Sequence, residues 1–147
     1  MFWLVSLGGK VAAIYEVERA DEQDPERDRL IASYGWAHFH AFTSLLAAEE
    51  GVDLTEMSGY GGENSWSTVA TPLRPLFDLD CFDGGRLPAR KCQAMQSRLH
   101  EVCELWSRGA YAGKAEEQMK IDQLNALRKL VAVVDGCVDT GRAMIIR

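Results

Sequence analysis

Apolar residues recur every three or four positions in three long segments of the chain, which is the spacing of one face of an α-helix. This pattern predicts helices over Trp36–Glu50, Pro88–Trp106 and Lys114–Val134. Gly51 follows the first of these segments, at a position where glycine commonly ends a helix. The residues expected to face the core from the second and third helices are Cys92, Met95, Leu99, Val102, Cys103, Trp106, Ile121, Leu124, Leu127, Val131 and Val134.

Strand-like runs lie at both ends of the sequence. Phe2–Leu7 and Val11–Val17 are rich in β-prone residues and are separated by Gly-Gly-Lys, which predicts a hairpin. Ala143–Ile146 predicts a last short strand. The charged connector after the hairpin contains Asp24–Ala32, where an aspartate followed by proline predicts the start of a short helix.

These elements predict one α+β domain that spans residues 1–147. Three long helices and one or two short ones would pack on a small antiparallel sheet formed by the N-terminal hairpin and the C-terminal strand. A chain of 147 residues is long enough to bury a core without disulfides or metals. The C-terminal strand fits a dimer edge as well as it fits pairing with the hairpin, so the oligomeric state stays open.

The region from Gly59 to Cys92 lacks the periodicity of its neighbours and contains many glycines, prolines and acids. Within it, a threonine followed by proline at Thr71–Leu73 is typical of one short helical turn. An irregular stretch of this length in a compact domain commonly carries a function. We therefore expect a binding site in the part from Gly59 to Gly85.

Composition narrows the classes of partner. Hydrophobic residues make up 47% of the chain and charged residues 26%, the balance of a soluble globular protein. The formal net charge is -6, with no basic stripe, which argues against nucleic acid and anionic membranes as partners. The apolar amino-terminal run stops at Gly8, too short for a signal peptide, and no run approaches the ~20 apolar residues that span a bilayer. A cytoplasmic location is expected.

The four cysteines are predicted to be reduced thiols. Cys92 and Cys103 fall on the apolar stripe of a predicted helix, Cys137 follows another, and only Cys81 lies in a loop. Their spacing matches no zinc site. The aspartates beside Cys81 should raise the pKa of its thiol, which makes it a poor nucleophile.

Asp78, Asp80 and Asp83, followed by Gly84-Gly85, place several carboxylates in a glycine-rich turn. Calcium requires converging oxygen ligands of this kind. The pattern departs from an EF-hand loop, however, because a lysine stands where that loop has its bidentate glutamate. The alternative is a surface turn whose aspartates bond to their own backbone and are neutralised by nearby cations.

The nearby cations are Arg86, Arg90 and Lys91, at the start of the second long helix. A helix start attracts anions, so a phosphate or an acidic side chain is one candidate ligand there. The alternative, which the charge balance favours, is that the adjacent aspartates already neutralise the positive charge at this helix start.

The segment Gly59–Asn64 supplies further candidate binding residues. Glycine lets a backbone approach a ligand or another chain segment closely. The segment is not a phosphate loop, because it lacks the required lysine. Trp66 is expected in the core. The candidate ligand- or partner-binding residues are Tyr60, Glu63, Asn64, Arg86 and Arg90.

The histidines give no catalytic or metal site. His38 and His40 are two residues apart on a predicted helix, so their side chains diverge by ~200°. His100 lies on a polar helix face. No second titratable group is placed beside any of them, and general acid–base catalysis needs such a pair in one pocket.

From Pro72 to Leu99 the chain resembles a widespread family of small uncharacterised proteins from bacteria and their phages, with a core motif Asp-Cys-x-Gly-x and then Ile or Leu. The matching residues are Leu76, Asp80, Cys81, Gly84, Leu87, Cys92, Arg98 and Leu99. Phe82 and Asp83 lengthen the interval between the Asp-Cys pair and the glycine. The resemblance implies a shared structural core and brings no activity with it.

The sequence favours a non-catalytic binding protein that recognises another protein or a small ligand through the irregular region Gly59–Gly85. An inhibitor, an immunity protein or a protein of phage–host conflict would be of this type. One alternative is a module stabilised by a divalent cation at Asp78, Asp80 and Asp83. A second alternative is a small hydrolase that uses one of the acids.

Overall fold

The computed structural model describes residues 11–18 and 31–146. The predicted strand Phe2–Leu7 and all but the end of the predicted helix Asp24–Ala32 lie outside the described residues. The elements are β1 (Val11–Val17), β2 (Ile31–Gly35), α1 (Trp36–Glu49), η2 (Leu54–Glu56), η3 (Trp66–Thr68), η4 (Arg74–Leu76), η5 (Leu79–Cys81), β3 (Arg86–Leu87), α2 (Ala89–Ser107), α3 (Glu117–Thr140) and β4 (Met144–Ile146), of which the η elements are 3-10 turns.

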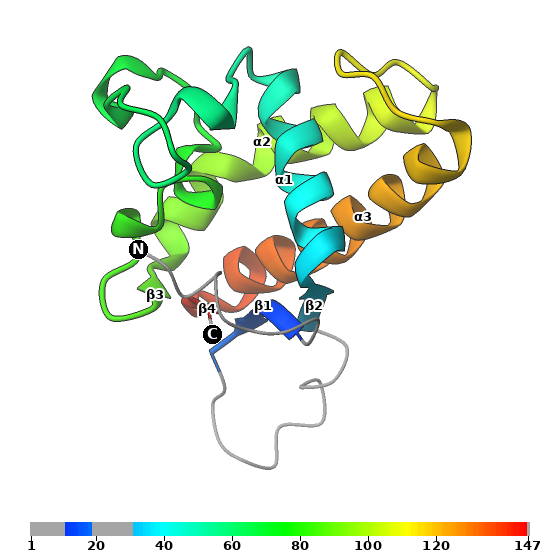
Figure 1. Ribbon diagram of the computed structural model, residues 1–147. Helices are drawn as coiled ribbons and strands as arrows, with labels where there is room; N and C mark the ends of the chain where they lie inside the picture. Colours follow the sequence, from blue (N-terminus) through cyan, green and yellow to red (C-terminus); the bar gives the residue numbers. More distant parts are fainter. Residues whose placement is uncertain (1–10, 19–30, 147) are drawn as a thin grey trace.

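The described strands form an antiparallel sheet in the order β2-β1-β4-β3. β1 lies inside the sheet, where Tyr15 pairs with Ala32 of β2 on one side and with Ile146 of β4 on the other. Segments near the two ends of the chain therefore meet in one sheet, and all three helices lie on the same side of it (Figure 1). The predicted α+β class is confirmed.

β2 occupies residues where the sequence predicted the end of a short helix, so that prediction is wrong at Ile31 and Ala32. Ala32 and Tyr34 are buried while Ser33 and Gly35 are exposed, which is the alternation of a strand with one buried face. The strand forms because this segment pairs with β1. β3 was not predicted either, and its two residues pair with β4.

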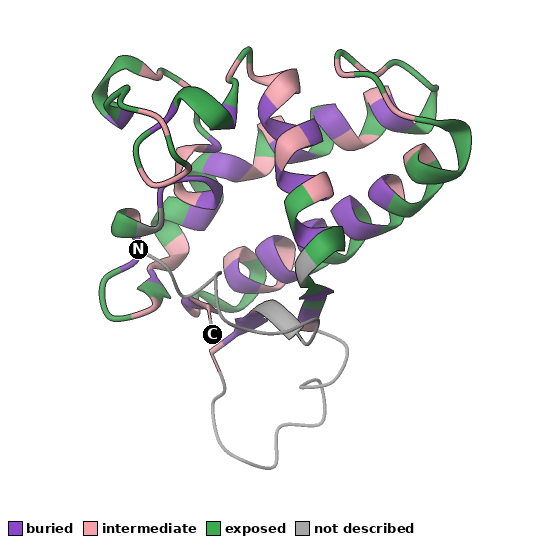
Figure 2. Ribbon diagram, viewed as in Figure 1, coloured by how far each residue is buried: buried purple, intermediate pink, exposed green. Residues whose placement is uncertain are grey.

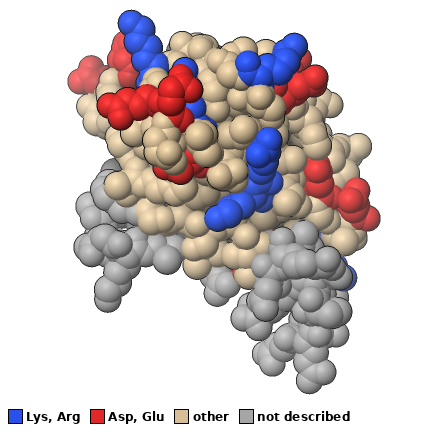
Figure 3. Space-filling model, turned by 90° about the vertical axis from the view of Figure 1, so that its right-hand side faces the viewer, with Lys and Arg blue, Asp and Glu red and all other residues tan. Residues whose placement is uncertain are grey.

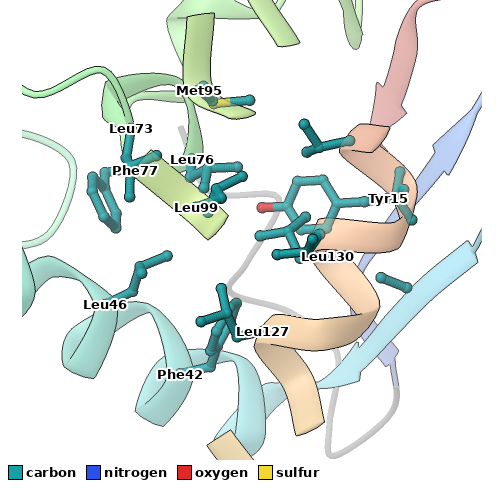
Figure 4. Close-up of a cluster of buried hydrophobic side chains, with 14 of the residues drawn as sticks. Tyr15, Phe42, Leu46, Leu73, Leu76, Phe77, Met95, Leu99, Leu127 and Leu130 are labelled. Atoms are coloured by element: carbon teal, nitrogen blue, oxygen red, sulfur yellow. The ribbon is translucent and has the colours of Figure 1, made fainter. Parts of the chain in front are cut away.

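The core lies between the sheet and the helices. Figure 4 shows that the sheet, each long helix and the irregular region all contribute side chains to it. The labelled members are Tyr15, Phe42, Leu46, Leu73, Leu76, Phe77, Met95, Leu99, Leu127 and Leu130. Three of these residues belong to the irregular region. That region is therefore part of the hydrophobic body as well as part of the surface, and Figure 2 shows buried, half-buried and exposed residues along it.

The three long helices are confirmed, with changes at the ends of the third. α3 starts at Glu117 and runs to Thr140, six residues beyond the predicted end. It ends at Gly141, whose φ of 68° is left-handed and suits glycine. Ile121 was predicted to face inward, but it is 55% exposed because it lies on the first, outer turns of the helix.

The cysteines among the described residues are all free thiols. Cys92 and Cys137 are fully buried and act as small apolar side chains, as predicted. Contact with Cys92, together with burial, raises the pKa of the Cys137 thiol far above its ordinary value. Neither thiol is accessible for nucleophilic chemistry.

Within the described residues, no helix has the length and apolar character needed to cross a bilayer. The face in Figure 3 carries basic and acidic side chains scattered around a broad uncharged area. That face has no continuous basic stripe.

Candidate functional site

The segment after α1 folds into a compact turn structure that shapes the protein surface. Asp53 caps η2: its Oδ1 atom accepts hydrogen bonds from the Thr55 backbone N at 3.0 Å and from the Thr55 hydroxyl at 2.6 Å. These bonds lower the pKa of the Asp53 carboxyl. Leu54 and Met57 are buried, while Asp53 and Glu56 are exposed.

The chain then doubles back on this turn. Met57 and Asn64 form a parallel bridge, and the Asn64 N–H donates to the Glu56 carbonyl at 2.9 Å. At Gly62, a Cβ atom would lie 2.0 Å from the carbonyl carbon of Glu56, so only glycine fits there. The glycine-rich segment thus serves a close approach of backbone to backbone. It brings Glu63 and Asn64, both predicted binding residues, beside η2.

Tyr60 is held in place by the residues behind it. Its hydroxyl donates to the Phe77 carbonyl at 2.6 Å, and burial, with a smaller contribution from Asp78, raises the pKa of this phenol to about 12. Trp66 packs edge-on against Tyr60 and stacks on Phe77, with ring centroids 6.1 Å and 6.2 Å away. The Trp66 indole donates to the Ser58 carbonyl at 2.9 Å. The prediction that Trp66 belongs to the core is confirmed.

A hollow of about 310 Å³ opens between α1 and this turn structure. Most of its exposed wall surface is apolar, as in many ligand pockets, although several lining residues also carry polar groups. The lining residues are His40, Ser44, Ala48, Val52, Asp53, Leu54, Thr55 and Tyr60. We call this the α1 hollow.

The α1 side of this hollow comes from one helix face. His40, Ser44 and Ala48 are four residues apart, so their side chains lie one above the other. The opposite wall is rigid, because Asp53 caps η2 and the Tyr60 hydroxyl is anchored. Of the residues predicted to bind, only Tyr60 lines the α1 hollow directly.

A second hollow, of about 270 Å³, lies where α2 ends and α3 begins. Trp106 and Tyr111 stack there at 4.9 Å, and the Lys120 ammonium lies 5.4 Å from the Tyr111 ring centroid. Lys120 also pairs with Glu117 at 3.3 Å. Polar groups of this α2–α3 hollow therefore already have partners within the protein.

The three aspartates that suggested calcium are not brought together. Asp78 is buried, and its Oδ2 atom accepts two hydrogen bonds from Arg74, both 3.1 Å long. Asp80 and Asp83 are exposed. Among the described residues, no group of three or more His, Cys, Asp or Glu side chains has the arrangement that a metal ion needs. Sequence reasoning missed Arg74 as the cation that neutralises Asp78.

Asp83 and Arg86 form a tight hairpin turn around two left-handed glycines. Their backbones exchange hydrogen bonds of 3.0 Å and 3.1 Å. The Arg86 guanidinium binds the Glu18 carboxylate at 2.9 Å and 3.0 Å rather than an aspartate of the turn. Arg90 is exposed on the first turn of α2. Neither arginine lines the α1 hollow.

The other candidate chemical groups also lie apart. His100 contacts Asp135 across α2 and α3 at 2.8 Å. Gln96 donates to the same Asp135 oxygen at 2.8 Å. Burial and the Asp78 carboxylate raise the pKa of the half-buried Cys81 thiol. The predicted direction is right, and the aspartate responsible is Asp78.

Comparison with models of protein families, with curated proteins and with solved structures gave no match for this chain. The resemblance of residues 72–99 to small bacterial and phage proteins stays a prediction.

Proposed function

We propose that this is a non-catalytic binding protein whose α1 hollow receives an apolar group of its ligand or partner. The observation that carries this proposal is the α1 hollow itself: a concavity whose wall surface is mostly apolar and whose turn side is held by hydrogen bonds of Asp53 and Tyr60. The proposed surface keeps Tyr60 from the predicted region and adds one face of α1 and the residues that follow that helix.

Rigidity supports this proposal, because a preformed site loses little conformational entropy when it binds. Glu50, at the C-terminal end of α1, accepts a hydrogen bond from Thr71 at 2.6 Å and two from the Arg98 Nε and Nη2 atoms to Oε2 at 2.9 Å and 2.6 Å. The irregular region, α1 and α2 are thereby joined by a carboxylate whose side chain is only 4% exposed.

The two alternatives, a divalent-cation module and a small hydrolase, gain no support from the described residues. Asp78 is already committed to Arg74, so the calcium hypothesis has no support from the placement of its ligands. The hydrolase hypothesis stays a prediction from the sequence. A cytoplasmic location stays a prediction from the sequence.

The proposed function is tested by titrating the isotope-labelled protein with benzene as a probe and following methyl groups by NMR. We expect the largest shift changes at Ala48, Val52 and Leu54, because their methyl groups line the α1 hollow. Leu124 and Ile121, in the α2–α3 hollow, serve as internal controls. Equal changes in both hollows, or none in the α1 hollow, would contradict the proposal.

A further inference from the structure

The chain segment that lines the α1 hollow carries acidic residues and no Lys or Arg. From Leu30 to Leu73 the chain contains no Lys or Arg, but it contains Glu49, Glu50, Asp53, Glu56 and Glu63. The acids are therefore concentrated in the residues that build and border this hollow. The segment is more strongly biased than the whole chain, which has 16 basic and 22 acidic residues.

Two of these five acids are used inside the protein. Glu50 is paired with Arg98. Glu49 accepts hydrogen bonds from the Trp106 indole at 2.8 Å and from the Ala112 N–H at 2.7 Å. Their charges are turned towards the scaffold, so they help to hold α1 in place.

The other three acids face solvent. Asp53 lines the α1 hollow, Glu56 lies in the same capped turn, and Glu63 is brought beside that turn by the bridge between Met57 and Asn64. All three are exposed, and none forms an ion pair with another described residue. Asp53 in the lining of the hollow and Glu56 and Glu63 beside that turn thus form an acidic surface, and we call these three residues the acidic rim.

Taking the proposed binding function as given, we propose that the partner is a protein segment that inserts one apolar side chain into the α1 hollow and places flanking Lys or Arg residues on the acidic rim. Complementary charges favour encounter and orientation at such a surface. A volume of about 310 Å³ lies at the lower end for ligand pockets, so it suits a single aliphatic or aromatic side chain.

The position of the acids favours a polypeptide over a small apolar molecule. The acidic rim extends from residue 53 to residue 63, mostly outside the lining of the hollow, where an extended segment can reach it. A second copy of this chain is also disfavoured, because it carries the same acidic rim and a net charge of -6.

The test is a selection of random displayed dodecapeptides on the immobilised full-length protein, followed by titration of the selected peptide in solution. We expect enriched peptides to carry one aliphatic or aromatic residue flanked by Lys or Arg. Their affinity should fall by about an order of magnitude when salt rises from about 50 to 500 mM, because exposed charges are screened.

Two variants separate the apolar anchor from the charges. Ser44→Trp fills the α1 hollow and should abolish detectable binding, and Ala48→Leu checks this result with a smaller change. Glu56→Lys combined with Glu63→Lys should weaken binding at least about tenfold by opposing the basic flanks. The matched control is Asp122→Lys combined with Asp139→Lys, which changes net charge equally on exposed positions of α3. It should weaken binding much less.

Each other result overturns one of the two proposals. Peptides with neutral or acidic flanks that still lose binding in Ser44→Trp would overturn the basic partner and leave the proposed function standing. Binding that survives both hollow-filling variants would overturn the proposed function. No enriched peptide would overturn the polypeptide partner, as would a dimer, seen by analytical ultracentrifugation, that Ser44→Trp disrupts.

Discussion

The α1 hollow and the α2–α3 hollow both lie beside groups that adjacent carboxylates at the C-terminal end of α1 hold in place. They differ in whether their charged groups have partners among the described residues. Glu50 binds Thr71 and Arg98 on the side of the irregular region, whereas Glu49 binds Trp106 and the backbone of Ala112 beside the α2–α3 hollow. Both carboxylates are structural. The difference lies in the walls around them.

In the α2–α3 hollow, the charged and aromatic side chains interact with one another. Lys120 pairs with Glu117 and covers Tyr111, whose hydroxyl donates to the Lys120 carbonyl at 2.9 Å. The α1 hollow has mostly apolar wall surface, and the acidic rim beside it forms no ion pair with another described residue. Carboxylates that form no ion pair with another described residue remain available to another molecule, so the α1 hollow is the better candidate for recognition.

The largest expected effect comes from removing the cation that supports the irregular region. Arg98→Met leaves the Glu50 carboxylate buried without its partner, which should lower the free energy of unfolding by about 3–5 kcal/mol. Chemical denaturation measures this loss. Arg86→Met, which breaks the exposed pair with Glu18, should change stability little. Equal losses of stability in both variants would contradict the larger contribution expected from the buried Glu50–Arg98 pair.

Gly62→Ala should be the next most damaging change, since its Cβ would overlap the Glu56 backbone. We expect a loss of about 1–3 kcal/mol, and a distorted wall of the α1 hollow that also weakens peptide binding. Gly35→Ala is the matched control, because no atom lies within 4 Å of its added Cβ. The prediction is wrong if thermal melting of the two variants agrees.

Tyr60→Phe and Tyr111→Phe compare one hydroxyl in each hollow. Loss of the Tyr60 hydroxyl leaves the Phe77 carbonyl without this donor and should cost about 1 kcal/mol. Tyr111→Phe should cost less, because the Lys120 carbonyl lies in α3 and can still accept the helical hydrogen bond. Urea denaturation resolves the difference, and the reverse order would contradict the assignment of Tyr60 as the better buried anchor.

The smallest effect concerns pH at the acidic rim. The Thr55 hydrogen bonds lower the folded-state pKa of Asp53, so its contribution to stability is present above the unfolded pKa of about 3.9 and is lost as pH falls through the lowered value. Asp53→Asn keeps an acceptor without titrating. Melting temperatures measured from about pH 6 to pH 2 should therefore converge for the two proteins at the acid end. Parallel curves would exclude this contribution.

The sequence located the long helices well, because each carries its own apolar stripe. Trp36 begins α1 as predicted, and the buried positions Met95 and Leu99 of α2 follow directly from the spacing. Ile31–Gly35 was missed as a strand, since its alternation is short and its pairing partner lies across a connector. Ile121 was misplaced because a periodic position faces the core only where another element covers it.

The candidate site was only partly predictable. Tyr60 was named from its glycine-rich surroundings, but His40, Ser44 and Ala48 gave no signal beyond a shared helix face. The long stretch without Lys or Arg is visible in the sequence and could have indicated an acidic surface. The aspartate cluster suggested a calcium site, but Arg74, four residues before Asp78, forms an ion pair with the Asp78 carboxylate.

The sequence by itself determined the helices, the α+β class and the acidic bias, since periodicity, turn residues and charge are local properties of the chain. Only the tertiary structure decided which acidic side chains bind groups within the protein and which face solvent. It also decided that α1 and residues 52–60 enclose an apolar hollow. A concavity depends on how distant segments pack, and the partners of a charge depend on the same packing.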